Sequence, residues 1–211
     1  MVTWRLLQLA DSAFPTGGFA HSAGLEAAAQ AGAAPDVAAF AREALWQAGW
    51  GAVPLVRAAW LDVSSLPRLD ARDDLFLANH VANRASRTQG AAFLSTCARV
   101  FPAEVSALPA GACLHLAPLW GGVFRALGMS LEESQRLYLW STARSVLSAA
   151  VRLGLAGTYE AQRTLVDLGP VLDAVAARCG ALGVEDLAQT APLVDLLQAL
   201  HDRLHSRLFQ S

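Results

Sequence analysis

Two histidines near the carboxyl terminus have the spacing of a metal-binding pair. His201 and His205 lie four residues apart in a stretch that is predicted to continue a helix opened by Pro192, so both imidazoles would lie on one helical face. Such a pair suits a metal ion, and Asp202 lies beside it. Only two good ligands are visible, so an interface role for His201 is favoured over a stable metal site, and we expect no resident metal or other cofactor.

A second group of candidate residues lies near the amino terminus. Asp11, Ser12 and His21 contain the side chains of a hydrolytic triad, but no G-x-S-x-G turn supports that interpretation. The alternative hypothesis is a small all-α hydrolase or metal enzyme that uses His21, Glu26, Asp11 and the pair His201 and His205. Under this hypothesis these side chains would converge in one pocket.

A Cys-x-His pair, Cys113 and His115, is a weaker candidate for ligation. It lies in an apolar segment, where a free cysteine usually behaves as a small hydrophobic residue. The three cysteines, at positions 97, 113 and 179, are widely spaced and form no Cys-x-x-Cys motif. Reduced thiols in a cytoplasmic protein are therefore expected.

Three arginines are candidates for contacts with a partner protein. Arg84 and Arg87 lie three residues apart and would be neighbours on one helical face. They could form a solvated face or an ion pair with Asp73 or Asp74, or they could contact an acidic partner. Arg152 precedes two glycines in an irregular stretch, and structural pairing and partner contact are equally compatible with that position.

Composition excludes several classes of protein. The chain has 211 residues, of which 54% are hydrophobic and 16% charged, with a formal net charge of −2. It is too apolar to be disordered, and it lacks the basic surface that nucleic-acid binding requires. All sixteen basic residues are arginine, so a P-loop or a pyridoxal phosphate Schiff base, which both need lysine, is excluded.

Apolar residues recur at helical spacing along the whole chain, which predicts a single all-α domain of roughly eight to ten helices. Pro15, Gly17, Gly18 and Gly24 are interpreted as structural turn residues. The charge-free stretch 105–124 is interrupted by proline and glycine, so a loop and a buried helix are favoured over a membrane span. The expected helices cover about 2–10, 19–31, 37–47, 69–102 (split near Asn83 or Gly90), 114–127, 130–153, 158–179 with a kink at Gly169-Pro170, and 192–205.

Four segments, taken together and in order, resemble the urease accessory protein F family, UreF. They are LADSAFPTGGFAHSAGLE at 9–26, NRASRTQGAAF at 83–93, VRL at 151–153 followed by Gly157 and Gln162, and HDRLHSRLFQS at 201–211. The chain departs from the family pattern at Leu155, where proline is usual, and at Thr158, where glutamine is usual. His205 stands where an aromatic residue is common.

This resemblance implies an all-α homodimer without catalytic activity. It implies a cytoplasmic accessory protein that binds UreD (also called UreH) and the GTPase UreG during GTP-dependent delivery of nickel to apo-urease. Arg84 and Arg87 could then contact an acidic partner, which is favoured over an arginine finger acting on UreG.

The segment 201–211 is predicted to be a partner-binding tail. Leu208 and Phe209 would be unfavourable in water on a frayed chain end, so we expect them to dock in a groove on this chain or on a partner. The hypothesis is that the tail becomes ordered on binding UreD/UreH. The residues assigned to partner binding are His201, Arg203, Ser206, Arg207, Leu208, Phe209, Ser211, Arg152, Arg84 and Arg87.

Overall fold

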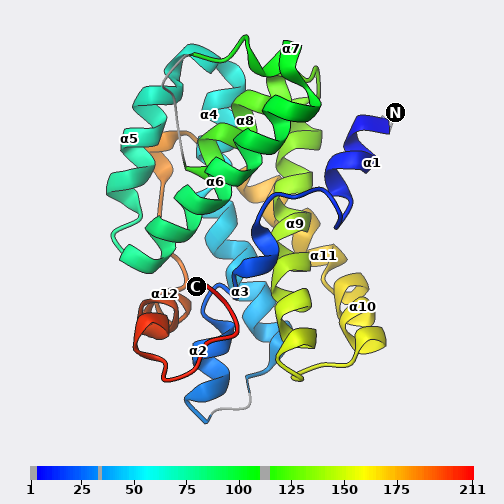
Figure 1. The fold of residues 1–211 in the computed structure, drawn as a ribbon, viewed down its shortest axis with the longest axis vertical. Coiled ribbons are helices and arrows are strands. Elements are labelled where there is room, and N and C mark those ends of the chain that lie inside the picture. Colours follow the sequence, from blue (N-terminus) through cyan, green and yellow to red (C-terminus); the bar gives the residue numbers. More distant parts are fainter. Residues whose placement is uncertain (1–3, 33–34, 110–114) are drawn as a thin grey trace.

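Helices form all of the regular structure in residues 4–32, 35–109 and 115–211, which are the residues that the computed structural model describes (Figure 1). This confirms the all-α class. Short 3-10 turns occur at Gly18–Ala20, Val63–Ser65, Val184–Asp186 and Leu200–Arg203. The α-helices are α1 Trp4–Ala10, α2 Leu25–Gln30, α3 Val37–Gly51, α4 Val53–Leu61, α5 Leu66–Phe76, α6 His80–Val100, α7 Pro102–Val105, α8 Leu116–Ala126, α9 Leu131–Arg152, α10 Thr158–Asp167, α11 Gly169–Cys179 and α12 Pro192–Ala199.

Two helix starts follow directly from their capping residues. The Asp36 side chain accepts a hydrogen bond from the amide of Ala39, 3.0 Å away, at the start of α3. Ser130 and Glu133 form a reciprocal capping box at the start of α9. Each side chain satisfies a backbone N–H that the first helical turn leaves free, and both predicted starts are confirmed.

The twelve α-helices of the described residues exceed the eight to ten expected, because predicted long helices are interrupted. The stretch 69–102 divides between Phe76 and His80 rather than at Asn83 or Gly90, which both lie inside α6. Asn79 causes the division, since its side chain caps the first amides of α6. The stretch 158–179 likewise divides into α10 and α11 at the predicted Gly169-Pro170 position.

The predicted helix 19–31 is also shorter than expected. Residues 18–20 form a 3-10 turn, and α2 begins only at Leu25. Gly24 lies between them with φ +91°, a conformation that favours glycine. A Cβ at Gly24 would lie 2.8 Å from the backbone nitrogen of Gln198, so this glycine also allows α12 to approach the start of α2.

The buried side chains form two hydrophobic clusters, one toward each end of the long axis in Figure 1. The upper cluster lies among α4, α5, α6 and α8 and contains Leu55, Leu66, Phe93, Trp120 and Phe124. The lower cluster lies among α2, α3, α10 and α11 and contains Leu25, Leu45, Leu147, Val175 and Phe209.

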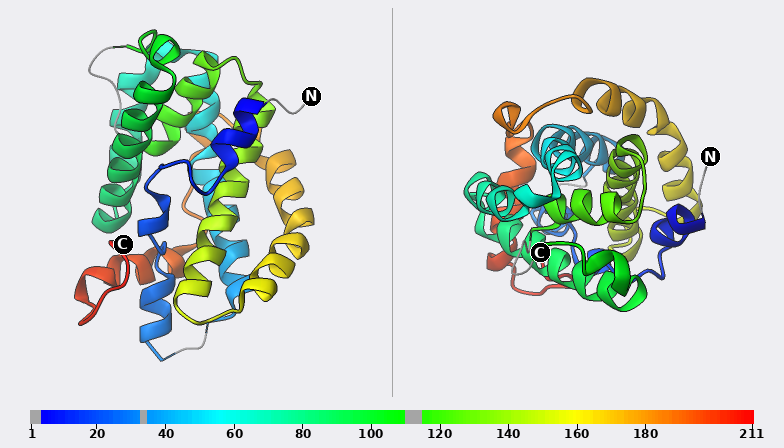
Figure 2. Two further views of the ribbon diagram at one scale, coloured as in Figure 1. Left: turned by 45° about the vertical axis from the view of Figure 1, so that its right-hand side comes forward. Right: turned by 90° about the horizontal axis from the view of Figure 1, so that it is seen from above.

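Helix α9 connects the two clusters. Its residue Leu137 packs in the upper cluster, whereas Leu139 and the buried residues from Ala143 to Ala150 pack in the lower one. The left view in Figure 2 shows α9 running along the long axis beside helices of both halves. The lower cluster includes Phe209, so the tail belongs to this core.

None of the helices in the described ranges has the length and apolarity needed to cross a bilayer. The described part of the stretch 105–124 ends in α8, whose residues Ala117–Phe124 are all buried by other helices. A buried helix was the favoured interpretation of this segment.

Helices α4 and α8 approach each other closely at Gly121. A Cβ at this position would overlap the carbonyl oxygen of Val56, which is rigid backbone. We expect Gly121→Ala to lower the free energy of unfolding by about 1–3 kcal/mol, because the two helices would have to separate. Gly169→Ala is a matched control in open space at the start of α11. Thermal unfolding should show a lower Tm for Gly121→Ala only, and equal Tm values would contradict this account.

Candidate functional site

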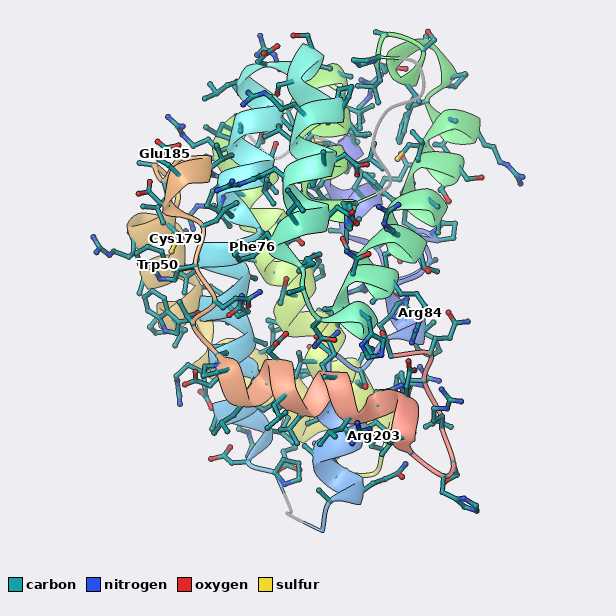
Figure 3. All side chains as sticks on the ribbon, turned by 90° about the vertical axis from the view of Figure 1, so that its left-hand side faces the viewer. Trp50, Phe76, Arg84, Cys179, Glu185 and Arg203 are labelled. Atoms are coloured by element: carbon teal, nitrogen blue, oxygen red, sulfur yellow. The ribbon has the colours of Figure 1, made fainter. Side chains whose placement is uncertain are left out.

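The tail, residues 201–211, lies folded against its own chain. Helix α12 runs across one end of the molecule, and the chain after Arg203 returns toward α2 and α6 (Figures 1 and 3). The amide of Gln210 donates to the carbonyl of Ala20 at 2.8 Å, and the amide of Ser22 donates to the carbonyl of Ser211 at 2.6 Å. Segments at opposite ends of the sequence are therefore paired through their backbones.

Glu26 is the buried centre of this contact. Its side chain is fully enclosed, with the residue 1% exposed, and it accepts three hydrogen bonds from the tail. The donors are Nε2 of His201 at 3.0 Å and the amides of Leu208 at 2.6 Å and Phe209 at 3.2 Å. A buried carboxylate needs such donors because it has lost its hydration.

His21 and Ser22 hold the last residue of the tail. Nδ1 of His21 is hydrogen-bonded to Oγ of Ser211, and Oγ of Ser22 donates to the Ser211 carbonyl at 3.1 Å. Within the described ranges, Nε2 of His21 and Nδ1 of His201 are buried without a hydrogen-bond partner. Burial first, and then the charges of His201 and Arg84, lower the pKa of His21 from 6.5 to about 4.

Arg152, at the end of α9, lies between two aromatic rings. Its guanidinium carbon is 3.9 Å from the ring centre of Phe19 and 4.2 Å from that of Phe209, and Nη1 donates to the Phe19 carbonyl. These cation–π contacts pack Phe209 against the turn before α2. The sequence is compatible with structural pairing and with partner contact at Arg152. The structure shows Arg152 in intramolecular contacts, and its contact with a partner stays a prediction.

Asp202 connects the tail to α6. It forms a bidentate pair with Arg84, at 2.7 and 3.1 Å, and also contacts His80 at 3.2 Å and Arg207 at 3.4 Å. The hydrogen bonds and charge of Arg84, and then the contact with His80, lower the pKa of Asp202 below its usual range. Arg84 thus pairs with neither Asp73 nor Asp74, whereas Arg87 forms the predicted pair with Asp74 at 2.7 Å.

An open depression lies beside these ion pairs on α5 and α6. Its volume is about 460 Å³. Arg84, one of its lining residues, is labelled in Figure 3, on the same side of the molecule as Arg203 of the tail. It is lined by Asp74, Leu77, Ala78, His80, Asn83, Arg84, Arg87 and Thr88.

The expectation that His201 and His205 share a helical face is wrong. Helix α12 ends at Ala199, and a 3-10 turn over Leu200–Arg203 directs His201 inward, where it is 0% exposed. His205 lies beyond that turn and is exposed. The described residues contain no group of three or more His, Cys, Asp or Glu side chains arranged to hold a metal ion.

The convergence expected of an enzyme is only partly present. His21, Glu26 and His201 meet at the tail, but Asp11 is exposed and caps its own turn through the amide of Ala13. The tail amides occupy both oxygens of Glu26. The arrangement therefore anchors a chain segment.

The predicted turn residues lie next to the same contact. Gly17 has φ +77° and precedes the 3-10 turn that contains Gly18, and the carbonyl of Pro15 accepts a hydrogen bond from Thr96 at 2.8 Å. Together with Gly24 they bring Phe19 and Ala20 to the tail. The remaining tail residues are outward: Arg203, Ser206 and Arg207 are exposed, and Leu208 is 54% exposed.

A second polar cluster lies under the depression. Cys113 is outside the described residues, but His115 is fully buried, with Nδ1 3.1 Å from Oγ of Ser86 and Nε2 3.3 Å from Oδ1 of Asp74. Burial lowers the pKa of His115 and, together with the charges of Asp70 and Asp74, raises the pKa of Asp73 to about 7.

Sequence reasoning missed the central role of Glu26, which was considered only as a catalytic group. It also missed Phe19 and Ser22 as partners of the tail, and Asp202 as the tail residue that pairs with Arg84. The available signal was a glutamate in the first turn of an otherwise apolar helix, where a charged residue among Leu25, Ala27 and Ala28 needs buried partners.

Comparison with known proteins identifies the family. The UreF family model matches residues 31–169. The chain is 36% identical to urease accessory protein F of Arabidopsis thaliana, over 99% of this chain and 92% of the relative. The chain belongs to the UreF family. It is also 33% identical to UreF of an Arthrobacter species and 29% identical to UreF of Mesorhizobium japonicum, in each case over 98% of this chain and at least 95% of the relative.

Membership of the UreF family confirms the resemblance noted in the sequence. All four UreF-like segments contribute to the tail contact: 9–26 supplies Phe19 and Glu26, 83–93 supplies Arg84, and 151–153 supplies Arg152. Four segments that are far apart in the sequence therefore meet at one place.

We expect His21 to make stability fall at acidic pH. Its pKa in the folded protein is below that of an exposed histidine, so as the pH falls through 6.5 the unfolded chain takes up a proton first and the folded state loses stability. Between pH 7 and pH 5 the Tm of the native protein should fall by about 2–4 °C more than that of His21→Gln. Calorimetry of both proteins checks this, and parallel curves would show that His21 does not titrate in this way.

Asp73 should act in the opposite direction. Its pKa is raised in the folded state, so it contributes stability at low pH that is lost as the pH rises through about 7. Asp73→Asn should therefore unfold at a higher temperature than the native protein at pH 8, with a difference that shrinks toward pH 5. A difference that does not change with pH would contradict the assignment.

Proposed function

We propose that this chain is a non-catalytic accessory protein in the maturation of urease. It would bridge UreD/UreH and the GTPase UreG in the cytoplasm and regulate GTP-dependent insertion of nickel into apo-urease. The observation that carries the proposal is the docked tail, which has the UreF-like terminal sequence and presents Arg203, Arg207 and Leu208 at the surface.

The relatives support the urease-related part of the proposal. Proteins that align with nearly the whole chain are named urease accessory protein F. The chain contains no lysine, so it cannot form an ordinary P-loop and the GTP must be held by another protein. Nickel is the cargo of the assembly, and no residue of this chain is assigned to hold it.

The tail supports a role in binding UreD/UreH. Its inward residues, His201, Phe209 and Ser211, are used to hold it, which leaves the outward residues free for a partner. Exposed Leu208 next to Arg207 combines apolar contact with charge, and arginine is enriched at the centres of protein interfaces. The partner would then bind a segment that is already docked.

The depression on α5 and α6 supports contact with a second, acidic partner. Arg84 and Arg87 line it, and a carboxylate from UreG or apo-urease could replace Asp202 or Asp74 as their partner. Ion pairs this exposed contribute little to stability, so exchange between partners is energetically accessible.

Exposed apolar residues support homodimerisation. Trp4 and Leu7 on α1 and Tyr159 and Val166 on α10 are exposed, which fits a chain whose apolar fraction is high for its size. We propose that the chain acts as a single helical domain that dimerises, and sedimentation analysis of the purified protein tests this.

Leu208→Ala tests the tail as the contact with UreD/UreH. Because Leu208 is exposed, its truncation should leave Tm unchanged while weakening binding about tenfold, the effect of losing one interface anchor. Leu61→Ala is the matched control, since Leu61 is 55% exposed at the end of α4. Affinity for purified UreD/UreH should fall for Leu208→Ala only.

Co-expression with UreD/UreH, UreG and apo-urease tests the whole proposal. We expect this chain to retain all of these proteins in a pull-down and to change the GTPase rate of UreG. Failure to recover UreD/UreH with the native chain would overturn the bridging role.

A further inference from the structure

Both carboxylate oxygens of the buried Glu26 side chain accept hydrogen bonds from the tail. One carboxylate oxygen accepts from Leu208, and the other from Phe209 and His201. With the tail docked, Glu26 is 1% exposed, so the tail supplies the donors that water would otherwise provide. Release of the tail breaks three hydrogen bonds to this carboxylate at once, two of them from backbone amides, and this opposes undocking.

Leu208 and Phe209, whose amides bond to Glu26, have side chains that face in opposite directions. Phe209 is 5% exposed and packs against Arg152, whereas its neighbour Leu208 is exposed. A shift of the tail by one residue would bring Leu208 inward and place Phe209 in water. The packing of Phe209 opposes such a shift, and Glu26 contributes because it binds the His201 side chain as well as the two amides.

We propose that Glu26 is a positioning residue for partner recognition: it holds the tail in the orientation that presents Leu208 and Arg207 before a partner arrives. This inference rests on the proposed binding of UreD/UreH to the tail. It departs from the expectation that the tail becomes ordered only on binding. A segment that is already ordered loses less conformational entropy on association, so its affinity is higher.

Glu26→Gln is the direct test, because it keeps the size of the side chain and places an NH₂ group where an acceptor is needed. Glu43→Gln is the matched control, an exposed glutamate on α3. Brief trypsin treatment of the isolated chain, followed by mass measurement, reports cleavage after Arg207 and loss of 208–211. We expect cleavage to be about tenfold faster in Glu26→Gln than in the native chain, and unchanged in Glu43→Gln.

A second readout separates positioning from a general structural effect. In the full chain Glu26→Gln should lower Tm, because it loses the bonds to the tail. A chain truncated before Leu208 lacks both amide donors, so Glu26→Gln has fewer bonds to lose and should leave Tm nearly unchanged. A fall in Tm of equal size in both chains would overturn the inference.

Affinity for UreD/UreH completes the test. We expect Glu26→Gln to bind about tenfold more weakly in the full chain and to have no further effect in the truncated chain. If the native protein binds UreD/UreH while Glu26→Gln matches it in cleavage and affinity, the inference is wrong and the proposed function stands. If the native chain does not bind UreD/UreH but Glu26→Gln still shows faster cleavage, the proposed function fails, and so does the role of Glu26 in partner recognition, although it still holds the tail.

Hydrogen exchange of the native chain keeps the inference testable if Glu26→Gln does not fold. The amides of Leu208 and Phe209 should exchange much more slowly than those of His205 and Ser206, for which the structure shows no bond to Glu26. Equally fast exchange at all four amides would contradict a tail held by Glu26.

Discussion

A carboxylate removed from water must be met by hydrogen-bond donors, and this requirement at Glu26 governs the arrangement of both chain ends. The donors come from His201, Leu208 and Phe209. These residues follow Glu26 in the sequence by 175, 182 and 183 positions. Because these bonds are shielded from solvent, they are worth more than equivalent bonds at the surface. The tail is thereby part of the folded structure.

The other contacts that hold the tail, the Asp202–Arg84 ion pair and the packing of Arg152 on Phe209, differ in strength because their exposure to solvent differs. The pair of Asp202 with Arg84 is partly exposed, so water and salt weaken it. Arg152 contributes more specific packing, because its guanidinium is enclosed by the rings of Phe19 and Phe209. The buried bonds thus fix the position of the tail, while the surface pairs are the contacts that a charged partner can exchange.

The helical framework brings these residues together. Helix α9 joins the two hydrophobic clusters and ends at Arg152, and α12 approaches α2 closely where Gly24 has no side chain. Phe209 completes the lower cluster. Packing of the core and docking of the tail therefore share contacts, since Phe209 belongs to both.

The sequence by itself determined the helical class, the helix starts at Asp36 and Ser130, and the family, because these depend on local spacing and on residue order. It also predicted that Leu208 and Phe209 would dock. Only the tertiary structure decided that Phe209 faces inward and Leu208 outward, that His201 bonds to Glu26 instead of sharing a face with His205, and that Arg84 pairs with Asp202. These outcomes depend on contacts between residues far apart in the chain, and local propensity carries no information about which distant donor a buried acceptor will meet.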